Sequence, residues 1–324
     1  MPKQLSEYLR KSNTSDELIW NFAFLGRNDN QNAKFTELAE LAEPENWTSS
    51  NSKRPNDILY SYITHTFERA FELGDDYVII NEDESYACFN TGLLTDNGED
   101  IICLFNTFDS SDEYHWHLFG FRKESNWDFL NNFSKTPLVP HFFTNPQDIY
   151  FDPNKELIKN LDHILEDNID RFEGRLQEKG KQFINALLNN AIELTITKCK
   201  RNYRIAVPQY YRGKITYLLP VTIDGQLMSV AVENINGRYR VNTIFTLEMA
   251  YKNARLLMKP EVDWITSATK QKKSSIYYSF LTLVLEIKPT YPFIKSFRNR
   301  KTYHTKQITF LKTIIHKYYF ILLF

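Results

Sequence analysis

The 324-residue chain lacks the short motifs that mark most nucleotide-dependent and metal-dependent enzymes. It contains no G-x-x-x-x-G-K-[ST], no G-x-G-x-x-G, no H-E-x-x-H and no G-x-S-x-G. Its three cysteines, Cys88, Cys103 and Cys199, have neither zinc-site spacing nor a paired disulfide framework. These absences argue against an NTPase, a Rossmann oxidoreductase and a zinc hydrolase. They predict free thiols in a reducing cytosol, with no cofactor and no metal.

Long apolar runs are absent as well. No stretch of about 18 apolar residues occurs, which argues against a transmembrane helix. The first residues, MPKQLSEYLRKSN, lack the apolar segment of a signal peptide. We therefore expect a cytoplasmic protein with no membrane partner, and the sequence does not indicate a protein partner. Because 42% of the residues are hydrophobic and 15% aromatic, a sizeable core is expected.

The final segment, residues 266–324, has no glycine, no aspartate and a single acid. It holds 11 of the 39 Lys and Arg residues, so 28 basic and 39 acidic residues remain in 1–265, a net charge of −11 against +10. One interpretation is a basic extension that binds a partner or a membrane surface. The favoured one is an out-of-frame or acquired end that does not join the main core.

The remaining chain predicts an α+β fold with two sheet-containing halves, 1–150 and 151–265. In the first half, apolar periodicity predicts a helix over 57–74, with Asp57 as its N-cap. Strands are expected at 77–80, 86–94, 100–105 and 114–121, and Asp96-Asn97-Gly98 suits a hairpin turn between the second and third.

The second half predicts helices followed by an antiparallel meander and a closing helix. Apolar stripes place helices at 157–172 and 175–200. Gly-containing turns separate four strand candidates. These are 204–211, 214–223, 227–235 and 238–245. Thr246 suits the N-cap of the closing helix, which runs over 247–257.

Polar groups interrupt otherwise apolar segments at three places. Asn90 and Thr91 break a strand, His65 lies at the margin of the 57–74 helix, and His163 belongs to the 157–172 helix. Since ligands tend to bind where polar groups converge in apolar surroundings, we expect these sites to meet at one cleft. His65 and His163 are the candidate acid/base groups, because histidine titrates near neutral pH.

A second set of candidates surrounds the closing helix. Arg255 and Asn253 do not belong to the apolar face of this helix and have no evident packing role. Tyr239 and Arg240 lie on the preceding strand. A guanidinium held at the polar edge of a packed helix suits an anionic ligand, whose bidentate contact lysine cannot copy. A protein carboxylate is the commoner partner of such an arginine.

His115 and His117 share one strand face in YHWH and would need a third ligand to bind a metal. A polar strand face is the favoured interpretation of this pair, so no metal site is expected.

Five segments in this order resemble a bacterial family, the domain of unknown function 3825. They are ITHTFERAFELG, ACFNTGLLT, FDPNKELIKNLDHILEDNIDRF, ITYLLPVTI, and TIFTLEMAYKNARLL with PEVDWI. The resemblance covers about residues 15–265. It implies an RNA context, because members are sometimes joined to an OST-HTH (LOTUS-type) RNA-binding module. Members typically stop shortly after the PEVDWI segment, which fits a foreign 266–324.

Three functions stay open. The first is an RNA- or nucleotide-binding module in RNA processing or defence, in which aromatic and arginine side chains stack bases and hold phosphates. The net charge of −11 argues against broad binding to nucleic acid, so a local basic and aromatic patch is required. The second is a metal-independent ribonuclease that uses His65 or His163 with Arg255 and a tyrosine. The third is an interaction protein without a ligand.

The ribonuclease hypothesis is an analogy of architecture, helices before an antiparallel meander. The side chains on the corresponding surface would be Tyr210, Tyr211, Arg212, Tyr239, Arg240 and Thr243.

Overall fold

The structure is a computed structural model. It describes residues 4–10, 15–49, 52–107, 114–211 and 213–266. The basic end, 266–324, therefore lies outside the described residues except for Thr266, and Arg212 lies outside them too. The α-helices are α1 Leu18–Phe22, α2 Asn28–Leu41, α3 Asp57–Leu73, α4 Trp127–Leu130, α5 Leu161–Asn168, α6 Gly174–Gln177, α7 Lys181–Cys199 and α8 Leu247–Ala254. The 3-10 helices are η1 Leu5–Tyr8, η2 Pro146–Ile149, η3 Ile169–Arg171 and η4 Tyr203–Ile205.

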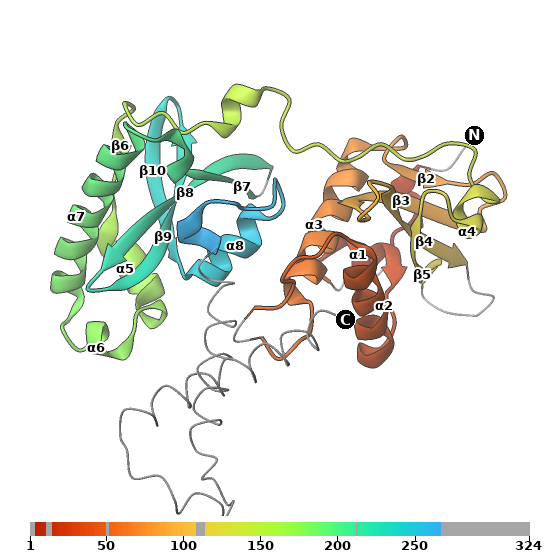
Figure 1. The fold of residues 1–324 in the computed structure, drawn as a ribbon, viewed down its shortest axis with the longest axis horizontal. Helices are drawn as coiled ribbons and strands as arrows, with labels where there is room; N and C mark the ends of the chain where they lie inside the picture. Colours follow the sequence, from red (N-terminus) through yellow and green to blue (C-terminus); the bar gives the residue numbers. More distant parts are fainter. Residues whose placement is uncertain (1–3, 11–14, 50–51, 108–113, 212, 267–324) are drawn as a thin grey trace, which may run out of the picture. The chain divides into compact units, whose positions relative to one another are not determined.

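The strands form two five-stranded sheets (Figure 1). The first has the order β1-β5-β4-β3-β2, from Ala23–Phe24, Trp116–Lys123, Asp100–Thr107, Tyr86–Leu94 and Val78–Ile80. The second has the order β6-β10-β9-β8-β7, from Leu157–Ile158, Arg238–Phe245, Gln226–Ile235, Lys214–Ile223 and Val207–Tyr211. Both are antiparallel except at one edge, where β1 is parallel to β5 and β6 is parallel to β10.

An aromatic core joins the first sheet to α1 and α3. Phe22 of α1 lies 5.0 Å from Phe67 of α3 and 5.4 Å from Phe105 of β4, measured between ring centroids. Phe67 also lies 5.2 Å from Phe89 of β3 in an edge-on arrangement, the geometry that aromatic pairs prefer. These rings are fully buried, so they account for much of the stability of this half.

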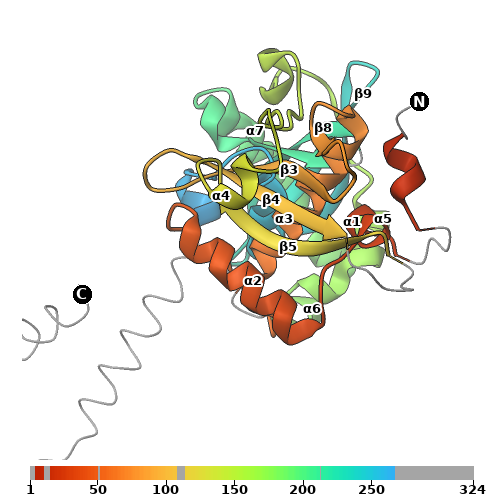
Figure 2. The same ribbon diagram turned by 90° about the vertical axis from the view of Figure 1, so that its right-hand side faces the viewer.

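The opposite face of the first sheet is covered by the short helix α4 and the residues after it (Figure 2). Phe129 and Phe133 stack there with a centroid distance of 5.4 Å, against Cys88, Ile102 and Leu104. Because both faces of the sheet are buried, β3 and β4 read as nearly continuous apolar runs.

Helices α5 and α7 cover one face of the second sheet. Leu188 and Ile192 of α7 belong to the same core as Leu219 of β8 and Val230 of β9. Helix α8 packs against β7 and β9 and also contacts α3. Ala250, Tyr251 and Ala254 of α8 belong to the core that contains the aromatic cluster of the first sheet. Both sheets therefore belong to one compact unit.

The α+β class and the four-stranded meander with its closing helix are confirmed. The expected single helix over 157–172 is wrong, because the segment divides into β6, α5 and η3. The expected helix over 175–200 is interrupted at Gly180, whose φ of +85° breaks it between α6 and α7. The N-cap of α3 is Asn56 in a left-handed conformation, and the Asp57 carboxylate instead accepts hydrogen bonds from Ser49.

The close approach of Gly92 to Tyr62, where the pairing of β3 with β4 is irregular, can be tested by substitution. Gly92 has a φ of +70°, and a Cβ at this position would lie 2.9 Å from the Tyr62 hydroxyl. Gly98 has a φ of +77°, but no atom lies within 4 Å of a Cβ built at this position.

Gly98→Ala should cost about 1–2 kcal/mol of unfolding free energy, the cost of an alanine in the left-handed conformation. Gly92→Ala should cost about 1 kcal/mol or more beyond that, because Tyr62 must also move. Urea unfolding of both variants measures the difference, and equal losses would contradict the close contact.

Candidate functional site

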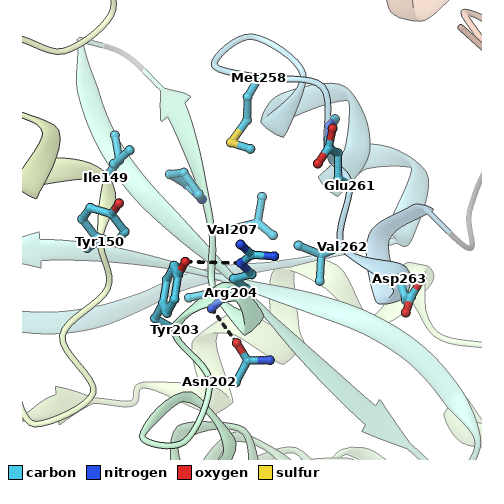
Figure 3. Close-up of a pocket in the computed structure, with 13 residues that line it drawn as sticks. Ile149, Tyr150, Asn202, Tyr203, Arg204, Val207, Met258, Glu261, Val262 and Asp263 are labelled. Atoms are coloured by element: carbon cyan, nitrogen blue, oxygen red, sulfur yellow. Dashed lines mark hydrogen bonds between the residues drawn. The ribbon is translucent and has the colours of Figure 1, made fainter.

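A cavity of about 520 Å³ opens at β7, an edge strand of the second sheet, and it falls within the size range of small-molecule pockets (Figure 3). Three chain segments line it: the end of η2, the turn from α7 into β7, and the segment after α8. We call it the tyrosine pocket. Its lining residues are Ile149, Tyr150, Asn202, Tyr203, Arg204, Ala206, Val207, Pro208, Met258, Pro260, Glu261, Val262 and Asp263.

The turn between α7 and β7 presents Tyr203 and Arg204 to solvent. Asn202 caps η4 by accepting a hydrogen bond from the Arg204 backbone N–H at 3.1 Å. The indole N–H of Trp264 donates to the Ile205 carbonyl at 2.9 Å, which ties this turn to the segment after α8. The backbone of the turn is therefore held in place, while the Tyr203 side chain stays 60% exposed.

Tyr150 forms a second aromatic element of the pocket and is 53% exposed. Its ring lies 5.8 Å from that of Tyr203, at an interplanar angle of 63°. Hydrogen bonds to the second sheet fix the chain on both sides of it. The Tyr217 hydroxyl donates to the Asp148 carbonyl at 2.7 Å, and the Asp152 backbone N–H donates to the Tyr239 hydroxyl at 3.0 Å.

Charge is divided across the pocket. Arg204 donates to the Tyr203 hydroxyl at 3.3 Å, and this hydrogen bond, with the negative charge of Glu261, raises the pKa of the guanidinium above its ordinary value. Figure 3 shows Tyr150 and Tyr203 on one side, and Glu261, Val262 and Asp263 on the other. The pocket therefore offers aromatic faces on one side and hydrogen-bond acceptors on the other, with the Arg204 guanidinium between them.

The sequence analysis missed Tyr150, Tyr203 and Arg204. One signal was available for the last two: KCKRNYR at 198–204 carries four cations within seven residues, in a chain whose first 265 residues are strongly acidic. Lys198, Lys200, Arg201 and Arg204 are all exposed in the structure. Cations at the end of a helix also offset its dipole. No comparable signal marks Tyr150.

Arg255 lies in a different place, against a buried carboxylate. Its Nε donates to both carboxylate oxygens of Glu45, at 2.8 and 2.9 Å. The guanidinium carbon lies 4.8 Å from the Trp47 ring centroid and 4.7 Å from that of Tyr62. The Tyr251 hydroxyl donates to the same carboxylate at 2.8 Å. The side chains of Glu45 and Arg255 are only 4% and 12% exposed, so Arg255 forms a buried ion pair with a carboxylate of the protein itself.

The polar interruption in β3 has internal partners as well. The Asn90 side chain donates to the Asp100 carboxylate at 2.9 Å and accepts from the Gly92 N–H at 2.9 Å. The Thr91 hydroxyl donates to the Ile101 carbonyl at 2.6 Å. Both residues are fully buried and stabilise the irregular strand.

The two candidate histidines are exposed and have separate partners. His65 Nδ1 lies 2.8 Å from the Ser61 carbonyl, and His163 Nδ1 lies 3.6 Å from the Asp167 carboxylate. Neither of them shares a contact with Asn90 in the part of the chain that the structure describes. The structure therefore does not bring these residues together through direct contacts.

The remaining predicted residues lie on β10 and α8. Tyr239 is buried, with its ring 4.7 Å from Phe151, and Arg240 donates to the Asn242 side chain at 2.9 Å. Asn253 is half-buried on α8. Ligand binding by Asn90, Thr91, Arg255, Asn253, Tyr239 and Arg240 stays a prediction.

The cysteines are all free and buried. Burial raises the pKa of Cys199 to about 11 and the pKa values of the other two thiols still further. Such thiols are protonated at neutral pH and therefore weakly nucleophilic. Among residues 4–266 with their gaps, no group of three or more His, Cys, Asp and Glu side chains is placed to hold a metal ion. In the same part of the chain, no helix has both the length and the apolar character to cross a membrane.

The fold and the pocket define a two-sheet α+β protein with an aromatic, partly charged surface cavity. Comparison with known families gives the assignment: the chain matches a family described as a domain of unknown function (DUF3825) over residues 38–264, and it belongs to that family. The match contains the whole of both sheets except β1. No significant match was found among curated proteins or among solved structures.

The buried ion pair gives a stability prediction. Arg255→Met keeps the apolar stem but leaves the Glu45 carboxylate without its guanidinium partner. We expect a loss of about 3–5 kcal/mol in unfolding free energy, the range for breaking a buried pair. Lys135→Met is the matched control, because Lys135 and Asp76 pair at 2.7 Å with side chains 58% and 69% exposed. It should cost less than about 1 kcal/mol. Chemical denaturation compares the two, and similar small losses would contradict a structural role for Arg255.

Proposed function

We propose that this protein binds single-stranded RNA through the tyrosine pocket. The observation that carries the proposal is the exposure of Tyr203 beside Arg204 at a cavity large enough for one nucleotide. A large aromatic side chain left in solvent gains little from burial, whereas it provides a face on which any base can stack. An adjacent guanidinium adds cation–π attraction to the base and a bidentate contact to phosphate.

The charge distribution supports local rather than general binding. Three of the four cations, Lys198, Lys200 and Arg201, come just before the lining residues 202–204, and the fourth, Arg204, lines the pocket itself. Cations that contact phosphates release counterions, and this release gives RNA binding most of its affinity and its salt dependence. The acidic remainder of residues 1–265 disfavours contact with a long polyanion elsewhere. The site therefore suits a short single-stranded segment, and binding to RNA fits the cytoplasmic location that the sequence predicts.

The ribonuclease alternative receives less support. Metal-independent cleavage requires acid and base groups within reach of the scissile phosphate. His65 and His163 are absent from the residues that line the tyrosine pocket, and Arg255 is held by Glu45. RNA recovered intact after incubation with the protein would be expected for a binding module, whereas shortened RNA would favour the enzyme.

The tyrosine pocket gives a direct test of binding. Tyr203→Ala should weaken binding of a fluorescein-labelled single-stranded RNA decamer by roughly 5- to 100-fold, because stacking of one base on an aromatic ring contributes about 1–3 kcal/mol. Trp127→Ala is the control, since Trp127 is 74% exposed but lies on α4, away from the pocket residues. It should leave the affinity unchanged. Fluorescence anisotropy measures both, with circular dichroism to confirm that the variants are folded.

The phosphate contact is tested separately by salt. Arg204→Gln should reduce the slope of log affinity against log salt concentration by about 1, as expected when one phosphate contact is lost. Arg238→Gln, which removes an exposed cation paired with Glu156, should leave the slope unchanged. A wild-type protein that binds no RNA at low salt, or a Tyr203→Ala variant with full affinity, would overturn the proposal.

A further inference from the structure

The opposite walls of the tyrosine pocket differ in chemistry in a way that bears on base identity. Tyr150 and Tyr203 supply aromatic faces, and Val207 and Val262 are apolar side chains of the lining. Glu261 and Asp263 lie on the other side, on the segment after α8 (Figure 3). Glu261 is exposed, at the third residue beyond Met258.

This arrangement orients a bound nucleotide. A base stacked on Tyr203 presents an edge, not a face, to the opposite wall. Phosphate is repelled by Glu261 and Asp263 and attracted by Arg204, so the sugar-phosphate group belongs beside Arg204, next to Tyr203. The edge of the base is then directed toward carboxylates, which when ionised only accept hydrogen bonds.

The four bases differ in what they offer to a carboxylate. Guanine presents two adjacent donors on its Watson–Crick edge, the N1–H and the N2 amino group, and these match both oxygens of one carboxylate. Adenine and cytosine each present one amino group next to an acceptor nitrogen. Uracil presents one N–H between two carbonyl oxygens, both of which repel a carboxylate. Single-stranded bases are read on this edge.

We infer that Glu261 makes the tyrosine pocket selective for guanine, with Asp263 adding negative charge that disfavours the carbonyl edge of uracil. The inference rests on the proposed function, since it assigns a base preference to the same site. A carboxylate is a charged acceptor, and hydrogen bonds to charged groups are stronger than those between neutral groups. Selectivity therefore resides in one side chain that can be changed without altering the aromatic wall.

The test uses the full chain and four oligouridylates that differ at one central position: G, A, C or U. We expect the wild-type protein to bind the guanine oligomer most tightly and the all-uridine oligomer most weakly. Glu261→Gln should lower the ratio of guanine to uridine affinity about tenfold, the equivalent of one charged hydrogen bond. Glu166→Gln is the control, because it removes the same charge at an exposed position of α5 and should leave the ratio unchanged. Competition with GMP, AMP, CMP and UMP separates a free nucleotide from RNA as the ligand.

The outcomes distinguish the inference from the proposed function. Equal affinity of the wild-type protein for all four oligomers, with Tyr203→Ala still weakening each, would overturn guanine selectivity and leave RNA binding intact. A guanine preference that survives Glu261→Gln would also overturn it. If no oligomer and no nucleotide binds, the proposed function itself fails. Displacement by GMP but not by UMP supports the inference.

Discussion

The buried pair between Glu45 and Arg255 is the constraint on which the arrangement of this fold depends. A carboxylate that is 4% exposed is costly unless a cation and hydrogen bonds compensate it. Tyr251 of α8 and Arg255 at its C-terminal end supply the hydrogen bonds and the cation. The rings of Trp47 and Tyr62 lie against the guanidinium. Helix α8 is thereby tied at its polar edge, as well as through its apolar face.

The position of α8 bears directly on the tyrosine pocket. The segment that follows the helix carries Glu261 and Asp263, and Trp264 then fastens that segment to the turn bearing Tyr203. The third wall is held by Tyr217 and Tyr239 of the second sheet, through hydrogen bonds on either side of Tyr150. Rigid elements thus position side chains that are themselves left in solvent, an arrangement typical of binding surfaces.

Local sequence was sufficient where structure depends on near neighbours. The apolar face of α3, the alternation and turns of β8 to β10, and the Thr246 cap of α8 could all be predicted, because each is specified within about 18 residues by periodicity or by a single hydrogen bond. The strands β1 and β6 could not, since two residues have no periodicity and form strands only by pairing with a distant neighbour. The break at Gly180 was not predicted either, because the apolar stripes on both sides of it indicate one continuous helix.

The sequence by itself determined the fold class, the meander, the division into two sheet-containing halves and the concentration of cations at 198–204. Only the tertiary structure decided which polar residues are internal and which face a cavity. Arg255 is a surface candidate by spacing on α8, yet its partner lies 210 residues away. Tyr150, Tyr203 and Glu261 are unrelated in sequence and line one pocket. Such choices depend on long-range packing, which brings distant segments together and which no local pattern encodes.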